Sequence, residues 1–428
     1  MSVRFIHAAD IHLGYEQYHN SERYNDFARA FQWLADQALA QHVDFLVLAG
    51  DLFHKFGIDP RTLLQAARQL ERLRAAGIPV IAVQGNHEQP HYQDHFSWLD
   101  YLAHSGLLVL LSPSYVEDKL VFAPWDPKRC KGAYVDLPGG VRVAGVAYSG
   151  ASTARIVQDL ANTLAAAPGP RPAYSVLMLH AGLEGILPGY SAALTRAQLN
   201  PLRDYVDYLA MGHIHKPFEQ DDWIYNPGSL ETNSTDEAAW EERGCYLVEL
   251  DDAQPRRHHA RKVIGPRRPF RCLSLEVDTC LTPEVLCRAL ETRLANEPRP
   301  ADGSAQPVVE LRLRGVLPFA RVDLDTARLE SIACRALNPL VWLFKDESTA
   351  PGELPTMAEG LSPAELEHQV LCELVGRDLR CRGQGERWAE LILQLKHMAL
   401  ARSAPERIVA ELRGFQETLD EGEGEASC

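Results

Sequence analysis

The sequence of 428 residues lacks several features that would place it in a specialised class of protein. Its nine cysteines include no C-x-x-C pair, which argues against a zinc or disulfide framework and is typical of reduced cytosolic proteins. No apolar run approaches the roughly 18 residues that a membrane helix needs. The first residues show no basic region followed by a long apolar stretch, so we expect no secretory signal. These absences predict a cytoplasmic protein without a membrane partner.

A surplus of basic charge is also absent, since the formal net charge is -15. This balance argues against nonspecific binding of polyanions by the whole surface. The charge is uneven, however, because residues 256–271 contain seven Lys or Arg and no acid, whereas residues 417–425 contain five acids. A local basic patch or a metal-dependent phosphate site therefore remains compatible with the sequence.

The chain is long enough for two or three domains, and its 46% apolar and 24% charged residues are typical of globular proteins. Short apolar runs with strand character alternate with helical patterns over the first 250 residues, which predicts an α/β domain with a buried sheet. The predicted strands are "VRFIHAA", "VDFLVLA", "IPVIAVQ", "YSVLMLH" and "VDYLAM". Between the first two, Phe27, Phe31, Leu34 and Ala38 mark one face of a helix.

The pattern changes after the basic stretch. "LSLEV" and "VELRLR" alternate polar and apolar residues, and the segments "PEVLCRALETRLAN" and "TARLESIACRALN" have helical spacing, which predicts a small α+β domain at 266–345. A linker at 346–360 and a helical segment at 361–428 follow. In the last segment, stripes that begin at Trp388 and Ile408 are amphipathic. Such stripes usually pack within their own domain, but docking on another chain is also consistent with the pattern.

The stretch "MGHIHKPF" places His213 and His215 one residue apart at the end of a predicted strand. In a strand these two side chains point to the same side, with Ile214 turned into the core. For an isolated pair, unrelated surface histidines are the more common case. Metal-capable residues also follow the other predicted strands, and these are Asp10, His12, Asp51, His54, Asn86, His87 and His180.

The carboxyl ends of strands in an open α/β sheet form a common ligand site, so we expect these residues to meet in one crevice. Carboxylate, imidazole and amide ligands without thiolate suit Mn, Fe or Zn. Two metal ions held close together need a bridging carboxylate, for which Asp51 is the natural candidate. Gly50, Gly85 and Gly212 each precede a predicted ligand, where a tight turn or a close backbone approach favours glycine.

This set of motifs resembles the calcineurin-like metallophosphoesterase superfamily. Within it, "ADIHLGYEQYH", "AGDLFH", "GNHE", "LMLHAG", "MGHIHKP" and "NPGSLE" are similar to DNA double-strand-break repair nucleases of the SbcD type and its archaeal meiotic-recombination-eleven form. The resemblance covers about the first 230 residues. It implies a sandwich of two packed sheets flanked by helices, followed by a small α+β capping domain that binds DNA and a helical C-terminal segment.

The resemblance also implies how the residues are used. One divalent ion, usually Mn²⁺ in this family, would be bound by Asp10, His12, Asp51 and His215, and a second by Asp51, Asn86, His180 and His213. His87 would protonate the leaving group or stabilise the transition state, and His54 would steer the phosphate or His87. The residue after His87 is Glu88, where many relatives have aspartate, and we expect this change to be tolerated.

DNA contacts implied by the resemblance lie in "GYEQYHNSERY", at Tyr15, Tyr18, His19 and Arg23. Phosphate contacts from Tyr and Arg are common, although a loop this polar is more often only solvated. The basic run "RRHHARKVIGPRR" would track a phosphate backbone, or else form a charged strand or interdomain connection.

Partners are implied as well. The helical segment would bind the coiled coil of an SbcC-type SMC-like ATPase, since this chain has no GxxxxGK[ST] of its own. The family forms homodimers through helices, for which residues 63–76 and 95–106 are candidates, with core packing as the alternative. The implied function is a Mn-dependent nuclease, an exonuclease on double strands and an endonuclease on single strands and hairpins, associated with the nucleoid. The alternatives are a phosphodiesterase acting on nucleotides or other small diesters, and a mainly structural subunit that tethers DNA ends.

Overall fold

The structure is a computed structural model that describes residues 3–89, 96–167, 170–188, 193–251, 257–298, 305–350, 363–376, 384–400 and 404–424. The chain divides into two compact units. One consists of residues 1–273, 294–311 and 330–344, and the other of residues 274–293, 312–329 and 345–428. No helix among the described residues is both long and apolar enough to cross a membrane.

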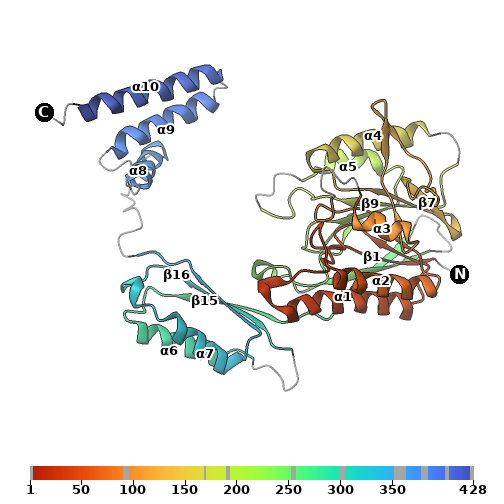
Figure 1. The fold of residues 1–428 in the computed structure, drawn as a ribbon, viewed down its shortest axis with the longest axis horizontal. Coiled ribbons are helices and arrows are strands. Elements are labelled where there is room, and N and C mark those ends of the chain that lie inside the picture. The colour runs from red at the N-terminus through yellow and green to blue at the C-terminus, as the bar shows by residue number, and fades with distance from the viewer. Residues whose placement is uncertain are drawn as a thin grey trace. The chain divides into compact units, whose positions relative to one another are not determined.

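The first sheet has six strands in the order β14-β13-β1-β2-β3-β4. Neighbours from β1 to β4 pair in parallel, whereas β13 and β14 pair antiparallel. The strands are β1 Arg4–Ala8, β2 Phe45–Leu48, β3 Val80–Ala82, β4 Val109–Leu110, β13 Gly244–Leu250 and β14 His258–Ile264. The connecting helices are α1 Ser21–Ala40, α2 Pro60–Ala75 and α3 Trp98–His104, and α1 and α2 run side by side in Figure 1.

The second sheet also has six strands, in the order β11-β12-β10-β9-β8-β7. They are β7 Tyr134–Leu137, β8 Val141–Val146, β9 Tyr174–His180, β10 Tyr208–Gly212, β11 Phe218–Gln220 and β12 Ile224–Asn226. Helices α4 Thr153–Ala166 and α5 Arg196–Leu199 contribute to a core on the outer face of this sheet. A hairpin of β5 Ser114–Val116 and β6 Lys119–Val121 lies outside both sheets.

The two sheets pack face to face through a core of aromatic and branched side chains. Phe5 of β1 stacks on Phe45 of β2 at 4.8 Å between ring centroids, and Phe5 meets the edge of Tyr208 of β10 at 5.3 Å. Further cores lie between each sheet and its helices. The predicted fold class, two packed sheets flanked by helices, is therefore confirmed.

Helix α1 shows why the local sequence folds as predicted. The side chain of Asn20 caps its first turn by accepting hydrogen bonds from the backbone N–H groups of Glu22 and Arg23, at 2.9 and 3.4 Å. The predicted face, made of Phe27, Phe31, Leu34 and Ala38, is buried, and the last three belong to the core between the helices and the first sheet. Burial of this stripe holds the loops that follow β1 and β2 on a rigid layer.

The predicted strands and helices after residue 265 are present. They are β15 Phe270–Glu276, α6 Pro283–Ala295, β16 Val308–Arg314 and α7 Thr326–Leu337. A further strand that was not predicted, β17 Val341–Asp346, completes a sheet in the order β15-β16-β17. The boundaries at 1–265, 266–345, 346–360 and 361–428 remain predictions, and residues 351–362 lie outside the described residues. Short 3-10 turns occur at Gln17–His19, Pro138–Gly140, Gly150–Ser152, Asn200–Leu202, Thr235–Glu237 and Arg321–Asp323.

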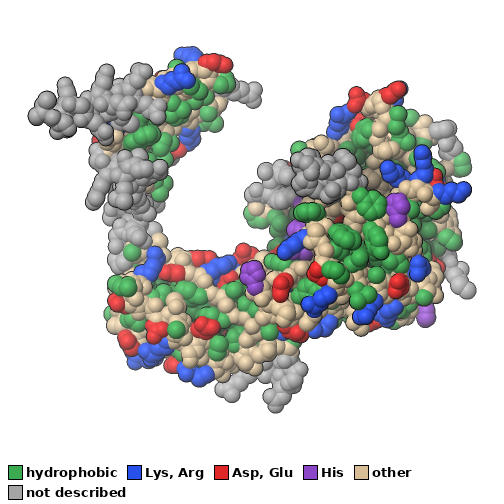
Figure 2. Space-filling view, in the orientation of Figure 1, with side chains coloured by type: hydrophobic (Ala, Val, Ile, Leu, Met, Phe, Trp, Pro, Cys, Tyr) green, Lys and Arg blue, Asp and Glu red, His purple; other side chains and the backbone are tan. Residues whose placement is uncertain are grey.

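The C-terminal segment is helical as predicted, with α8 Pro363–Gly376, α9 Gly385–Leu400 and α10 Pro405–Gly424. The two predicted stripes meet each other, since the rings of Trp388 and Phe415 lie 4.8 Å apart. Other apolar side chains stay exposed, including Leu400 at 71% and Val409 at 45%. Hydrophobic surface is visible on this segment in Figure 2.

Lys262 of β14 gives the fold a pH dependence that can be measured. Its ammonium group lies 4.8 Å from the Tyr246 ring centroid and donates to the carbonyl of Pro227. Burial lowers the pKa of Lys262 from 10.5 to about 7. Between about pH 7 and pH 10.5 the unfolded chain keeps a proton that the folded chain has lost, so the free energy of unfolding rises with pH across this window.

We therefore expect Lys262→Met to flatten the rise in unfolding free energy between pH 7 and pH 10, measured by urea titration at each pH. The matched control is Lys119→Met, at an exposed position of β6. Equal slopes for the two variants would contradict the prediction.

Candidate metal centre

The predicted ligands come together where the strands of the two sheets end. Asp10 and His12 follow β1, Asp51 follows β2, and Asn86 follows β3. His180 is the last residue of β9 and pairs in register with Gly212 of β10, after which His213 and His215 follow. Among the described residues, potential His, Asp, Glu and Cys ligand atoms within 4.8 Å of one another form three groups, which are Asp10, His12 and His215; Asp10, Asp51 and His180; and His12, His54 and His87.

One side of the centre is formed by His12, His215 and Asp10. The Nε2 atoms of His12 and His215 lie only 3.0 Å apart. The carboxylate of Asp10 accepts the backbone N–H of His213, with both oxygens at 3.0 Å from the nitrogen. Asp10 and His12 are buried, so their polar atoms face one another and not bulk water.

The other side contains an amide oxygen between two imidazoles. Asn86 Oδ1 lies 3.0 Å from His180 Nε2 and 2.9 Å from His213 Nδ1. Asp51 Oδ2 lies 3.4 Å from His180 Nε2 and 4.0 Å from His12 Nε2. Asp51 is therefore within reach of both sides, as a bridging carboxylate has to be.

Strained backbone accompanies these side chains. Asp10, His12 and Asp51 have φ angles of 53°, 53° and 55°, and His213 has a φ of 87°. Positive φ is uncommon for residues other than glycine, and such strain gathers at functional sites. The loops thus hold four predicted ligands in conformations that the surrounding packing has to enforce.

The placement of "MGHIHKPF" corrects one argument from the sequence. Strand β10 ends at Gly212, so His213 and His215 belong to a loop and the strand alternation does not apply to them. The predicted burial of Ile214 is nevertheless present, at 2% exposure. Its carbonyl oxygen accepts a hydrogen bond from Asn226 Nδ2 at 2.6 Å, which anchors the loop.

The three glycines are needed for close approach. A Cβ on Gly85 would lie 2.0 Å from Asp51 Oδ1, and a Cβ on Gly212 would lie 2.1 Å from the carbonyl oxygen of Ala49. Gly50 has a φ of 93°, and a Cβ there would lie 2.1 Å from His180 Nδ1. Any side chain at these positions would displace a predicted ligand or its support.

Two histidines each use Nδ1 for a hydrogen bond to the protein, which leaves Nε2 to bind a metal ion. His180 Nδ1 lies 2.7 Å from the carbonyl oxygen of Ala49, so Nδ1 carries the proton. His215 Nδ1 lies 2.7 Å from Glu237 Oε1. With Nδ1 held in this way, loss of the Nε2 proton leaves a lone pair directed at the other candidate ligands, where a cation would bind it. The donor set therefore fits a pair of divalent ions.

The charges within the centre shift each other's pKa. Burial opposes ionisation of Asp51, but the charge and hydrogen bond of His180 outweigh it and lower the pKa of Asp51. Burial would lower the pKa of His180, whereas the Asp51 carboxylate raises this pKa to about 9. Burial raises the pKa of Asp10. These opposed shifts indicate a compact group of charges that lacks solvent screening.

The two histidines predicted for catalysis lie beside the centre. His87 Nδ1 is 2.7 Å from the carbonyl oxygen of His54, and the backbone N–H of His87 donates to Asp51 Oδ1 at 3.1 Å. The rings of His54 and His87 lie 5.1 Å apart. The ring of His54 stacks on Tyr15 at 3.7 Å. Burial, followed by the charge of His87, lowers the pKa of His54 to about 4.

Glu88 ties the loops after β2 and β3 together. Its carboxylate accepts backbone hydrogen bonds from Asp51, Phe53 and Gly85 at 3.2, 2.8 and 3.0 Å. Burial, followed by the charge of Asp51, raises the pKa of Glu88. The longer side chain of glutamate thus spans a fully buried position that aligns Asp51 and Gly85.

Two residues near the centre had no signal in the sequence. Glu237 supports His215, although it lies 22 residues downstream in a three-residue turn. Tyr148 follows β8 and lies with its ring 5.3 Å from His213 and 6.0 Å from His180. These two residues are recognised only from their positions in the structure, because neither belongs to a motif with regular spacing.

The residues predicted to contact DNA differ in exposure. His19 is exposed, and Tyr15 and Tyr18 are partly exposed. Arg23 is fully buried, and its guanidinium pairs with Asp26 at 2.5 Å and Glu231 at 3.3 Å. The prediction for Arg23 is therefore wrong, because its donors serve a buried network and do not face solvent.

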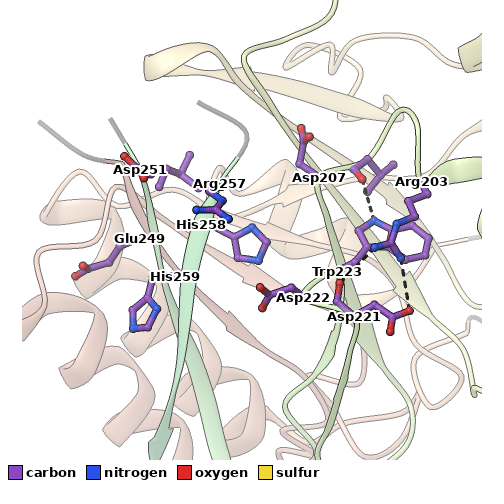
Figure 3. Close-up of a pocket in the computed structure, with 12 residues that line it drawn as sticks. Arg203, Asp207, Asp221, Asp222, Trp223, Glu249, Asp251, Arg257, His258 and His259 are labelled. Atoms are coloured by element: carbon purple, nitrogen blue, oxygen red, sulfur yellow. Dashed lines mark hydrogen bonds and ion pairs between the residues drawn. The ribbon is translucent and has the colours of Figure 1, made fainter. Parts of the chain in front are cut away.

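A hollow of about 760 Å³ lies near the start of β10, away from the predicted ligands (Figure 3). Acidic residues, two arginines and two histidines line it, and Arg203 Nη1 pairs with Asp221 Oδ2 at 3.5 Å. Trp223 Nε1 donates to the carbonyl of Val206 at 2.8 Å. Since none of the predicted ligands borders this hollow, we place the candidate site at the strand ends.

The loop after β10 separates a role in metal binding from a role in folding. We expect His213→Ala and His215→Ala each to reduce the number of Mn²⁺ ions bound, measured by isothermal titration calorimetry. Ile214→Ala should leave the number bound unchanged and lower the free energy of unfolding by about 2–4 kcal/mol. His104→Ala, at an exposed position of α3, is the control. Full Mn²⁺ binding by both histidine variants would refute the assignment.

Comparison with known proteins identifies the first half of the chain. A family model described as calcineurin-like phosphoesterase matches residues 3–217. The DNA double-strand break repair protein Mre11 of Archaeoglobus fulgidus is 33% identical over 244 residues, which cover 55% of this chain and 52% of that protein. The protein of the same name from Saccharolobus solfataricus is 27% identical over 260 residues, with 59% and 62% covered.

The chain spans about half the length of the curated relatives that it matches. Among solved structures, the calcineurin-like phosphoesterase YfkN from Bacillus subtilis aligns with a TM-score of 0.38 and 14% identity, over 69% of this chain and 97% of that chain. The family model covers every predicted ligand from Asp10 to His215. The chain therefore belongs to the calcineurin-like phosphoesterase family.

Proposed function

We propose that the chain is a Mn-dependent DNA nuclease that hydrolyses phosphodiester bonds in double-strand-break repair. The main support is the position of Asp51, whose carboxylate oxygen lies 3.4 Å from His180 Nε2 and 4.0 Å from His12 Nε2. A carboxylate placed between two groups of further ligands is what a two-metal phosphoesterase needs. The names of the curated relatives support DNA as the substrate.

The proposed ligands follow the two sides of the centre. One ion would be held by Asp10, His12, Asp51 and His215, and the other by Asp51, Asn86, His180 and His213. When bound, such ions neutralise the phosphodiester and lower the pKa of a bound water. The carboxylate, amide and imidazole set is consistent with Mn²⁺.

His87 is the proposed proton donor to the leaving oxygen. The carbonyl of His54 lies 2.7 Å from His87 Nδ1, which leaves Nε2 of His87 as the atom that faces the substrate. His54 is held against Tyr15 and would orient His87 and the phosphate. Two further side chains of the same segment, the partly exposed Tyr18 and the exposed His19, are proposed to contact the DNA backbone.

DNA cleavage that depends on His87 is the direct test of this proposal. We expect His87→Ala to lower cleavage of linear and hairpin-ended DNA in Mn²⁺ by about 10²–10⁴-fold, because a positioned proton donor contributes that much. Mn²⁺ binding should be retained, since His87 is not a proposed ligand. Lys119→Met, at an exposed position of β6, is the control and should cleave DNA like the wild type.

A parallel assay with bis(p-nitrophenyl) phosphate separates the alternative functions. Turnover of this small diester without any DNA cleavage would replace the nuclease by a phosphodiesterase acting on nucleotides or other small molecules. If His87→Ala keeps both activities, His87 has no role in the mechanism. A folded, metal-loaded wild type that hydrolyses neither substrate would favour a mainly structural subunit that tethers DNA ends.

The C-terminal helices are proposed to bind the coiled coil of an SbcC-type SMC-like ATPase. The stripes on α9 and α10 contact each other at Trp388 and Phe415, while Leu400, Val409 and Leu412 are 71%, 45% and 39% exposed. Exposed apolar side chains on an amphipathic helix are typical of a helix-docking surface. Residues 266–345 are proposed as the capping domain that binds DNA.

Partner binding is tested by changing only exposed side chains. We expect the double variant Leu400→Asp and Leu412→Asp to lose co-purification of a large coiled-coil ATPase, and removal of residues 361–428 to do the same. Leu281→Asp, at a position with 69% exposure, is the control. Retention of the ATPase by the chain without residues 361–428 would disprove this site.

Helices α2 and α3 are proposed to form a homodimer contact. Leu64 on α2 is 49% exposed, and Phe96 and Tyr101 at α3 are 50% and 45% exposed. Figure 2 shows hydrophobic side chains gathered over α3. A cytoplasmic location in association with the nucleoid is part of the same proposal.

A further inference from the structure

A three-residue turn, η5 (Thr235–Glu237), supports one proposed metal ligand from behind. Glu237 Oε1 lies 2.7 Å from His215 Nδ1. The other carboxylate oxygen accepts hydrogen bonds from Arg243 Nη2 at 2.8 Å and from the backbone N–H of Asn233 at 3.0 Å. Both oxygens of Glu237 are thus held, and the imidazole of His215 is aligned by a group that cannot rotate freely.

Arg243 fixes the same turn from inside the protein. It is fully buried, and its guanidinium also donates to the backbone carbonyls of Glu231 at 3.1 Å and Glu237 at 3.2 Å. A buried guanidinium is stable only when it is paired and hydrogen-bonded. The position of Glu237 is therefore determined by the buried network and not by the loop alone.

The opposite side of η5 is bonded to strands β15 and β16. Thr235 Oγ1 donates to Glu310 Oε2 of β16 at 2.7 Å, and Cys272 Sγ of β15 donates to the carbonyl of Thr235 at 3.3 Å. Thr235 and Glu310 are 7% and 1% exposed. Only one residue of the chain, Asp236, thus separates a residue that contacts these strands from the residue that contacts His215.

A second route connects the segment before β15 to the same network. Arg268 pairs with Asp26, Nε to Oδ2, at 2.5 Å, and donates to the carbonyl of Gln306 at 2.6 Å. Asp26 pairs with Arg23, and Arg23 pairs with Glu231. The carbonyl of Glu231 then accepts from Arg243. A continuous series of largely buried contacts therefore connects Arg268 to Arg243, which holds Glu237.

We propose that η5 is a positioning element that makes binding of the divalent cation at His215 depend on strands β15 and β16. Glu237 sets the ring of His215, and Thr235 sets Glu237 through its bond to Glu310. The inference rests on the proposed metal centre. The proposed coupling is reciprocal. A change in the conformation of these strands alters the affinity for the metal ion, and metal binding alters the conformational free energy of the strands by the same amount.

Isosteric removal of one charge tests the first link. We expect Glu237→Gln to weaken Mn²⁺ binding at one of the two sites by about 10- to 100-fold, the usual effect of losing the partner of a histidine ligand. Isothermal titration calorimetry and the electron paramagnetic resonance of bound Mn²⁺ report this without DNA. Glu249→Gln removes a carboxylate that pairs with Arg4 at 3.0 Å and should bind Mn²⁺ like the wild type.

The second link is tested without touching the charge next to Arg243. Thr235→Val and Glu310→Gln should each weaken binding at the same site by a smaller factor, and the double variant should weaken it no more than the stronger single variant. Thr163→Val, which removes the hydroxyl that donates to the carbonyl of Asp159 at 2.7 Å on α4, is the control. Circular dichroism and thermal melting establish that each variant is folded.

Wild-type Mn²⁺ affinity in folded Glu237→Gln would overturn the positioning role of Glu237. If that variant does not fold, unchanged affinity in both Thr235→Val and Glu310→Gln overturns the proposal instead. Strictly additive losses in the double variant would overturn the coupling to Glu310. Failure of the nuclease proposal appears separately, as absence of DNA cleavage by a wild type whose variants show the expected changes in Mn²⁺ binding.

Discussion

The carboxylate of Asp51 is the constraint around which the centre is arranged. It follows β2 in the middle of the first sheet, yet it lies 3.4 Å from a histidine at the end of β9 in the second sheet. Glycine at position 85 leaves the space for this approach, because a Cβ there would lie 2.0 Å from the carboxylate. Glu88 holds the backbone of Asp51 and Gly85 from the buried side. The identity of the neighbouring residues follows from the need to keep one charged group between two imidazoles.

Much of this arrangement is predictable from the sequence, because its physical cause is local. Buried strands are recognisable as short apolar runs, and the carboxyl ends of parallel strands meet at one edge. Five such runs that end in metal-capable residues therefore predict a common site without knowledge of the loops. The face of α1 is predictable for a similar reason, since Phe27, Phe31, Leu34 and Ala38 repeat at helical spacing.

The parts that could not be predicted depend on contacts between distant segments. Arg23 lies in a polar stretch that is typical of a solvated loop. It is nevertheless buried, because its guanidinium pairs with Glu231 and with Asp26, and Asp26 also pairs with Arg268. Glu237 has no motif, because its role depends on the path of the chain after β12. Strand alternation predicts that His213 and His215 point to the same side, whereas both lie in a loop in which His213 has a positive φ. Periodicity carries no information about such pairings.

The proposed ligands of the centre come from both layers of the sandwich. Asp10, His12, Asp51 and Asn86 follow strands of one sheet, and His180, His213 and His215 belong to the other. Ions coordinated by both groups would join the sheets at their rim in addition to the apolar core between them. A ligand that binds only the folded state stabilises it in proportion to the logarithm of its free concentration. The unfolding temperature of the sandwich would then report the concentration of free metal ion around the protein.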